Sequence, residues 1–254
     1  MKTVLITGAT SGIGMACAKL FAANGYQLII TGRRKERLEE LENELIKTHN
    51  SKVLALCFDV RSYAECEAAF NTISAANLYV DVLINNAGLA AGLTPIQDGE
   101  LGNWERMIDT NIKGLLYITK LTAPMMIERK KGHIINIASI AGKEAYPNGN
   151  VYCATKAAVD SLSKTMRIDL LPYNIRVCNI APGMVETEFS VVRFNGDTEK
   201  ASNVYKNVKP LNGDDIAQTV LWVANAPEHV NIADVYITPT AQANTRDLIR
   251  TEGI

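Results

Sequence analysis

The strongest constraint on the fold is a set of seven short apolar runs that recur along the chain. Each run is rich in Val, Ile and Leu and is continuous, without the alternation of apolar and polar residues typical of a half-exposed strand. Such runs suit strands that are buried on both faces of a parallel sheet. The runs are TVLITG (3–8), QLIITG (27–32), KVLALCF (52–58), VDVLINNAG (80–88), GHIINIAS (132–139), IRVCNIAP (175–182) and VYITPT (235–240).

Helix-like segments separate these runs. In residues 35–48, Leu38, Leu41 and Leu45 stand at helical spacing among charged residues, so one face should pack on the sheet while the other faces water. A strand followed by a helix, repeated about six times, predicts an α/β fold with a Rossmann-type doubly wound parallel sheet and helices on both faces. Because no repeat, low-complexity stretch or linker divides the chain, we expect one domain over residues 1–254.

The composition argues against several classes of protein. With 47% hydrophobic and 21% charged residues, the chain is an ordinary globular protein with a large core. Its formal net charge of −1 argues against nucleic acid or an anionic membrane as the main partner. No apolar run approaches the roughly 20 residues that span a bilayer, and the apolar stretch at the N-terminus is too short for a signal peptide. We therefore expect a cytoplasmic location.

The cysteines and histidines predict neither disulfides nor a metal site. The five cysteines are scattered, odd in number and lack a CxxC pair, which favours reduced thiols. The three histidines stand far apart and show no metal-ligand spacing. We expect metal-free chemistry.

A glycine-rich segment, TGATSGIG at residues 7–14, follows the first apolar run and opens a helix. Gly8, Gly12 and Gly14 would permit a tight turn and let backbone amides approach a pyrophosphate at the helix N-terminus. Their spacing, GxxxGxG, departs from the general GxGxxG fingerprint, so the position between strand and helix carries the prediction. We expect a dinucleotide to bind here, beyond the carboxyl ends of the strands.

The end of the second run favours NADP(H) over NAD(H). An NAD-binding unit usually places an acidic residue about 20 positions after the glycines, whereas this chain has Gly32, Arg33 and Arg34 there. A carboxylate would repel a 2′-phosphate, and a guanidinium pairs with it through two parallel hydrogen bonds. Positive charge at a helix start also opposes the helix dipole and so needs another reason.

The segment NVYCATKAAV at residues 150–159 combines a phenol and an ammonium. Tyr152 and Lys156 are four positions apart, so they share one face of a helix. Tyr and Lys at this spacing also occur on many ordinary helix surfaces, and the pair alone leaves both interpretations open.

Considered together, the motifs resemble the short-chain dehydrogenase/reductase family along nearly the whole chain, and their order makes the resemblance highly specific. The landmarks are TGATSGIG, Asp59–Val60, NNAG at 85–88, Asn111 in DTNIKG, Ser139 in NIAS, the pair Tyr152 and Lys156, and Pro182–Gly183. More narrowly, the chain resembles the NADP-dependent 3-hydroxy acid (serine and allo-threonine) dehydrogenases of that family. That resemblance is carried by GLLYIT, GHIINIASIAG, YPNGNVYCATKA, PGMVETEFSVVRFNGD and HVNI.

The resemblance implies roles for four residues. Tyr152 is expected to be the general acid–base, and because a free phenol has a pKa of about 10, something must lower it. Lys156 and the positive nicotinamide ring would favour the phenolate, and Lys156 would also hydrogen-bond the nicotinamide ribose. Ser139 would hold the substrate oxygen. Asn111 would kink its helix and hold a water that links Lys156 to solvent.

The resemblance also implies a cofactor site. Asp59 should meet the adenine with Val60 beside it, the Thr187 hydroxyl should lie near the carboxamide, and Asn85 should brace the sheet. Cys153 is expected to be a small packing residue. The expected cofactor-binding residues are Gly8, Thr10, Ser11, Gly12, Ile13, Gly14, Arg33, Arg34, Asp59, Val60, Asn86, Ala87, Gly88, Tyr152, Lys156, Pro182, Gly183, Val185 and Thr187.

Substrate choice is expected to depend on the segment at about 184–212. A 3-hydroxy acid such as serine, allo-threonine or 3-hydroxyisobutyrate needs a partner for its carboxylate, and Arg193 is the candidate there. An exposed or structural Arg193 stays equally open. Tyr146, Asn148 and Asn150 could also touch polar groups of the substrate.

Three other functions stay open. A 3-oxoacyl carrier-protein reductase or a general carbonyl reductase of the same family would share every catalytic landmark, and a redox sensor could bind the cofactor without catalysis. The resemblance further implies a homotetramer, built by the helices near 101–130 and 150–172, which carry more apolar and small residues than one sheet-facing stripe needs.

Overall fold

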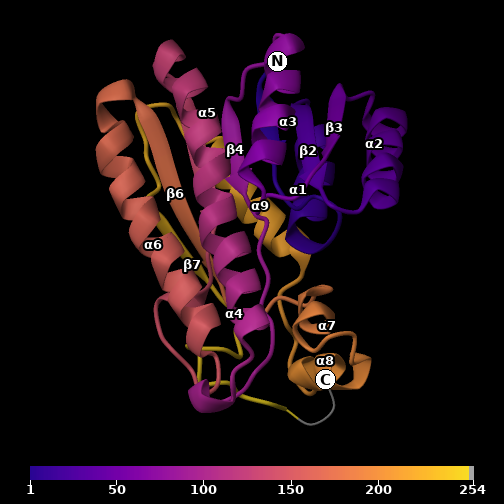
Figure 1. The fold of residues 1–254 in the computed structure, drawn as a ribbon, viewed down its shortest axis with the longest axis vertical. Coiled ribbons are helices and arrows are strands. Elements are labelled where there is room, and N and C mark those ends of the chain that lie inside the picture. The colour runs from indigo at the N-terminus through magenta and orange to yellow at the C-terminus, as the bar shows by residue number, and fades with distance from the viewer. Residues whose placement is uncertain (252–254) are drawn as a thin grey trace.

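The computed structural model describes residues 1–251, and the seven predicted runs form one parallel sheet (Figure 1). Its order is β3-β2-β1-β4-β5-β6-β7, and every neighbouring pair is parallel. The strands are β1 (Thr3–Ile6), β2 (Gln27–Gly32), β3 (Val53–Cys57), β4 (Val82–Asn85), β5 (Gly132–Ile137), β6 (Ile175–Pro182) and β7 (Asp234–Ile237). The strand order reverses between β1 and β4, which opens a ligand-sized crevice at the carboxyl ends in sheets of this type.

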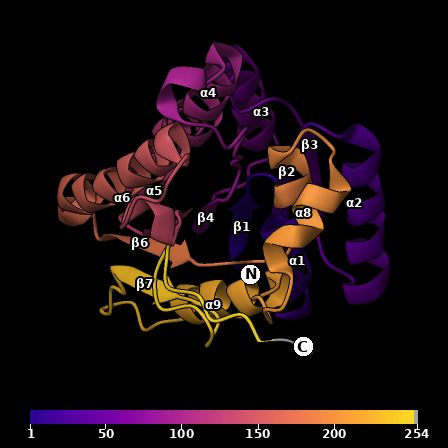
Figure 2. The same ribbon diagram turned by 90° about the horizontal axis from the view of Figure 1, so that it is seen from below.

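Helices cover both faces of the sheet (Figure 2). Residues of α1, α2 and α9 pack against one face, and residues of α3, α5 and α6 pack against the other. The helices are α1 (Gly12–Ala23), α2 (Lys35–His49), α3 (Tyr63–Ala75), α4 (Leu101–Ile108), α5 (Leu115–Arg129), α6 (Asn150–Leu170), α7 (Phe189–Arg193), α8 (Thr198–Tyr205) and α9 (Gly213–Ala224). The doubly wound α/β prediction is therefore confirmed.

Burial on both faces explains why the runs are continuously apolar. In β1, Val4 and Ile6 belong to one core cluster and Leu5 to the other. In β2, Leu28 lies in the first cluster and Ile29 in the second. Each fully buried side chain of this size stabilises the fold by roughly 1.5–3 kcal/mol, so alternating polar residues would be costly on either face.

The helix expected near 101–130 is interrupted in the structure. A π-helical turn, η2 (Asp109–Gly114), separates α4 from α5. Asn111 lies in this turn, so the regular α-helix is interrupted at the residue where a local kink was expected. Among residues 1–251, none of the helices is both long and apolar enough to cross a membrane.

The segment after β6 lies beyond the carboxyl ends of the strands. It carries the short helices α7 and α8, which stand apart from the sheet at the lower right of Figure 1. Three short 3₁₀ turns, at Ile96–Asp98, Ile140–Gly142 and Leu171–Tyr173, complete the elements of the described chain. The loops that follow β1, β2, β4, β5 and β6 therefore meet at one edge of the sheet.

Candidate active site

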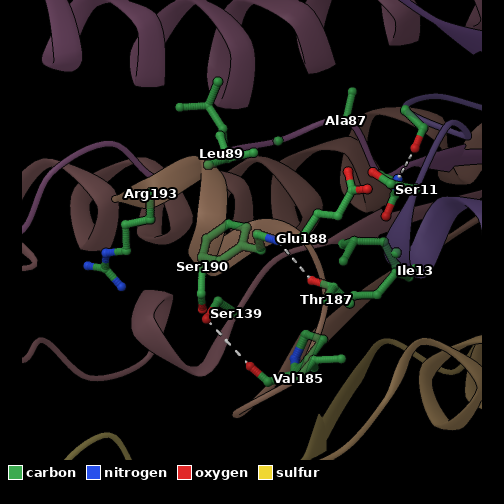
Figure 3. A pocket seen from close by; sticks show the side chains of 18 of the residues that line it. Ser11, Ile13, Ala87, Leu89, Ser139, Val185, Thr187, Glu188, Ser190 and Arg193 are labelled. Atoms are coloured by element: carbon green, nitrogen blue, oxygen red, sulfur yellow. Dashed lines mark hydrogen bonds between the residues drawn. The ribbon is translucent and has the colours of Figure 1, made fainter. Parts of the chain in front are cut away.

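A cavity of about 600 Å³ lies at this edge and is lined by residues from the segments that follow all seven strands. Its lining runs from the glycine loop at Gly8 to Tyr152 and Arg193. Figure 3 shows Ser11 and Ile13 at one end of the labelled residues and Arg193 at the other, with Thr187 and Glu188 between them. The volume lies within the range of small-molecule and cofactor sites, roughly 300–1,000 Å³.

All of the residues predicted to bind the cofactor line this cavity except Gly14. Gly14 lies behind the loop, where a Cβ would overlap the carbonyl oxygen of Gly8. Gly8 and Gly12 have φ angles of +68° and +53°, which side chains with a Cβ rarely adopt. The glycines therefore serve two purposes, since two allow the turn and the third allows the helix to pack close to it.

The two predicted arginines have different surroundings. Arg34 donates to the Thr10 hydroxyl at 3.0 Å and the Ser11 hydroxyl at 2.8 Å, and it forms an ion pair with Glu188 at 2.8 Å. The Arg33 side chain is 53% exposed and lies 3.4 Å from an Asp59 carboxylate oxygen. Arg33 is thus the more available cation, while Arg34 ties the glycine loop to the segment after β6.

Asp59 is held ionised at the rim of the cavity. Burial alone would raise its pKa, but hydrogen bonds from Arg61 and the charge of Arg33 outweigh burial and keep the pKa below its ordinary value. The Arg61 guanidinium contacts the carboxylate at 2.6 Å.

Side-chain amides at the end of β4 brace the site. Asn86 donates from Nδ2 to the Thr7 carbonyl at 2.9 Å and to the Gly8 carbonyl at 3.1 Å, which fixes the glycine loop against β4. Asn85 donates to Asn136 at 2.9 Å and to Thr119 at 3.0 Å. The prediction that Asn85 braces the sheet is confirmed.

Tyr152 and Lys156 lie on the same face of α6 and both line the cavity. Both side chains are buried, and the Lys156 Nζ atom lies 6.0 Å from the centre of the Tyr152 ring. Nζ donates to the Ile137 carbonyl at 2.9 Å. Burial lowers the pKa of Lys156 to about 8.

The side chains around Tyr152 do not by themselves lower the pKa of its phenol, and the joint effect expected of Lys156 and the nicotinamide ring stays a prediction. Burial raises the pKa of the phenol above its ordinary value, while a hydrogen bond with Ser139 and the charge of Arg193 lower it and offset burial only in part. The physical reason is that the ring is enclosed and that Lys156 points to the Ile137 carbonyl. The nearby cation that does favour the phenolate is Arg193.

Ser139 and Asn111 occupy different positions relative to the cavity. Ser139 lies just beyond the end of β5, lines the cavity, and donates to the Pro182 carbonyl at 3.4 Å. Asn111 is buried beneath it, where its side chain binds both main-chain groups of Leu89 at 2.8 Å and donates to Thr155 at 3.0 Å. Asn111 therefore joins η2 to α6 and to the loop after β4.

Arg193 and Tyr146 form a pair in the cavity. Arg193 donates to the Tyr146 hydroxyl at 2.8 Å, and its guanidinium carbon lies 5.5 Å from the Tyr146 ring centre. The same carbon lies 5.6 Å from the ring centre of Tyr152. The Arg193 guanidinium therefore lies close to both rings, and it hydrogen-bonds to the hydroxyl of Tyr146.

The structure does not bring Asn148 and Asn150 into the main cavity. Both line an adjacent cavity of about 70 Å³, which Tyr152 and Arg193 also border. Asn150 donates to the Thr94 carbonyl at 2.9 Å, and Asn148 is exposed in a turn with a φ of +65°. The buried Cys153 packs in a small apolar cluster, as predicted.

Several residues that line the main cavity were not predicted from the sequence, and polar side chains in the second half of the chain are among them. Glu188 is one, and Gln242 and Thr245 in the C-terminal segment are two more. The Gln242 side-chain oxygen accepts from the Met184 main chain at 2.8 Å, which anchors the segment after β6. No motif marks these residues, because their positions depend on contacts between distant parts of the chain.

Comparisons with known proteins identify the family of this chain. The family model described as short chain dehydrogenase matches residues 2–197. The chain is 48% identical to NADP-dependent 3-hydroxy acid dehydrogenase YdfG of Salmonella typhi, over 94% of this chain and 96% of that protein. It is 43% identical to sulfoacetaldehyde reductase 2 of Chromohalobacter salexigens, over 94% and 95% of the two chains.

A solved structure has the same fold over almost the full length. The closed form of serine dehydrogenase complexed with NADP⁺ matches with a TM-score of 0.91 at 44% identity, covering 98% of this chain and 100% of that one. With the family match over residues 2–197 and relatives above 40% identity along nearly the whole length, the chain belongs to the short-chain dehydrogenase family.

Proposed function

We propose that this chain is an NADP-dependent oxidoreductase that oxidises the CH–OH group of small 3-hydroxy acids such as serine, allo-threonine or 3-hydroxyisobutyrate. The observation that carries the proposal is the Arg193 guanidinium, which lines the same cavity as Tyr152 at 5.6 Å from its ring. A cation at this distance suits a short substrate with its carboxylate close to the reacting hydroxyl. The names of the relatives support the same substrate class.

The cavity residues fit an NADP molecule. The left-handed Gly8 and Gly12 allow the close backbone approach that a pyrophosphate needs. Arg33 and Arg34 supply guanidinium groups at the end of β2, where a 2′-phosphate requires cations. Bound NADP⁺ supplies the acceptor for the two electrons and the hydrogen that leave the substrate carbon.

The side chains of the protein manage the proton and the position of the substrate. Tyr152 takes the hydroxyl proton in oxidation and returns it in reduction. Ser139 holds the reacting oxygen by a hydrogen bond, and Lys156 holds the cofactor ribose. Arg193 orients the carboxylate, since a buried carboxylate without such a partner would be costly to desolvate.

The same arrangement supports a second substrate class. A sulfonate carries the same charge as a carboxylate, and a relative with 43% identity is a sulfoacetaldehyde reductase. Reduction of a short sulfonated aldehyde would use the same Tyr152 proton and the same Arg193 contact. A 3-oxoacyl thioester would use Tyr152 but would leave Arg193 without an anion close to the reacting carbon.

The test is to replace Arg193 by Met and to compare charged with neutral substrates. Loss of a charge-assisted contact costs roughly 1.5–3 kcal/mol, so KM for serine and 3-hydroxyisobutyrate should rise roughly tenfold to a hundredfold. KM for a neutral secondary alcohol should change far less. Arg167→Met, at a position on α6 outside the cavity lining, is the matched control.

Two outcomes would contradict this substrate assignment. An equal loss for charged and neutral substrates would make Arg193 a structural residue. Faster turnover of acetoacetyl thioesters than of every hydroxy acid and hydroxysulfonate would favour the acyl-reductase function.

A further inference from the structure

Glu188 lines the cavity at the end opposite Arg193, and it bridges Arg34, which also lines the cavity, to Arg37, which does not. One carboxylate oxygen lies 2.8 Å from Arg34 Nη1, and the other lies 2.6 Å from Arg37 Nη1. All three side chains are about half-exposed. The Glu188 carboxylate therefore accepts from one Nη1 atom on each of the two guanidinium groups.

These contacts join three parts of the site. Arg34 also binds Thr10 and Ser11 of the glycine loop, and Arg37 lies in the first turn of α2. Glu188 follows Thr187 and directly precedes α7, the helix that ends at Arg193. In Figure 3 the Glu188 side chain extends toward Ser11, away from Arg193. The segment that carries the substrate arginine is thus tied to the adenosine end of the cavity.

The negative charge of Glu188 stands where a second anion, the 2′-phosphate of NADP, would also be attracted by the arginines. Hydrogen bonds from Arg34 and then Arg37 hold the pKa of Glu188 below its ordinary value, so the group is ionised at neutral pH. A 2′-phosphate recognises guanidinium nitrogens through the same forked geometry as a carboxylate. A 2′-phosphate placed at Arg34 and Arg37 would meet the same Nη1 atoms that the carboxylate contacts, and like charges placed together repel each other.

We propose that Glu188 is a specificity-determining residue that competes with the 2′-phosphate of NADP for Arg34 and Arg37, and so limits the affinity for that phosphate. The inference rests on the proposed NADP dependence. Because binding is reciprocal, the phosphate also weakens the contact that ties the segment of Thr187 and Arg193 to α2. Arg33, whose contact with Asp59 is long, stays available to the phosphate throughout.

The experiment measures binding of two small probes by titration calorimetry, without turnover. Adenosine 2′,5′-bisphosphate carries the 2′-phosphate, and adenosine 5′-monophosphate does not, so neither depends on the nicotinamide or the substrate. Glu188→Gln removes the carboxylate charge at constant shape. Glu186→Gln makes the same charge change two residues earlier, at an exposed side chain outside the cavity lining.

We expect Glu188→Gln to lower the Kd of the bisphosphate by about threefold to tenfold, the range expected for two half-exposed ion pairs. The Kd of the monophosphate should change by less than about twofold, as should both constants in Glu186→Gln. In a chain that carries Arg34→Gln and Arg37→Gln, the same Glu188→Gln substitution should give a smaller gain for the bisphosphate, because only the direct repulsion between the two anions remains to be relieved.

An unchanged or weaker affinity of Glu188→Gln for the bisphosphate would overturn the inference, while the NADP proposal would stand. An equal gain for both probes would also overturn it, because the 2′-phosphate would then have no special part. If the wild-type chain binds the bisphosphate no better than the monophosphate, the NADP proposal itself is overturned.

Discussion

The positive charge that lowers the pKa of Tyr152 belongs to Arg193, which lies 41 positions further along the chain. Burial raises the pKa of the phenol, and Arg193 lowers it from a position 5.6 Å from the ring centre. Arg193 therefore has two proposed effects, one on the carboxylate of the substrate and one on the acidity of the catalytic phenol. With a substrate that lacks a carboxylate, only the effect of Arg193 on the acidity of the phenol remains, so the two effects can be measured separately.

The first prediction concerns this acidity. With a neutral secondary alcohol as substrate, the rising limb of kcat/KM against pH reports the ionisation of the base. Arg193→Met removes a group that lowers the Tyr152 pKa, so the limb should move to higher pH. Arg193→Lys keeps the charge and should leave the limb near its wild-type position. A limb at the same pH in all three proteins would contradict the electrostatic effect.

Individual contacts of the site were the part that sequence could least predict. The residue types at the strand ends follow motifs, but the bonds of Arg193 to Tyr146 and of Arg34 to Glu188 span 47 and 154 positions. Such contacts depend on how the segment after β6 packs against the first half of the sheet. The same reason explains why Asn148 and Asn150, which are close to Tyr152 in sequence, lie outside the main cavity.

At the scale of elements, β5 contains a polar side chain with an unusual environment. His133 is 1% exposed, and within residues 1–251 neither ring nitrogen has a hydrogen-bond partner. Burial, and then the charges of Arg176 and Lys2, lower its pKa to about 3. The strand therefore contains a histidine that stays neutral in the folded chain across the physiological range.

The second prediction is that His133 makes the folded chain less stable in acid. Below about pH 6.5 the unfolded chain takes up a proton at His133 that the folded chain refuses, so stability falls as the pH falls towards 3. The slope from one such group is at most about 1.4 kcal/mol per pH unit. Urea unfolding of the wild type and of His133→Leu at pH 7 and pH 5 measures it. The variant should lose less stability between the two pH values, and equal losses would contradict the prediction.

The elements themselves were largely predictable because their apolar patterns are strong. All seven runs became strands, and the Leu38, Leu41 and Leu45 stripe became the buried face of α2. The π-helical turn at Asp109–Gly114 is different, since no periodicity marks it. It is accompanied by the bonds from Asn111 to Leu89 and Thr155, which are tertiary contacts.

At the scale of the whole molecule, some apolar side chains on the outer helices are left uncovered. Leu101 on α4 and Ile168 on α6 are both 68% exposed, and Leu116 on α5 is partly exposed. Apolar groups on these helices suit an interface between copies of the chain. We propose that these positions contribute to the interfaces of the homotetramer that the family resemblance implies.

The third prediction is the mass of this assembly. Light scattering at micromolar concentration should give four times the mass of one chain. Leu101→Lys and Ile168→Lys each add a charge to an exposed apolar position and should shift the mass towards smaller species. A monomer mass for the wild type at that concentration would contradict the tetramer.

The most direct test of the account as a whole is a comparison of Tyr152→Phe with the wild type in two measurements. The variant lacks only the phenolic hydroxyl, so it should bind NADP⁺ with a Kd within about twofold of the wild type in calorimetry. Without the acid–base group, its rate of NADP⁺ reduction with serine or 3-hydroxyisobutyrate should fall by roughly a hundredfold or more. Near-normal turnover in Tyr152→Phe would contradict the assignment of Tyr152 and, with it, the proposed chemistry of the site.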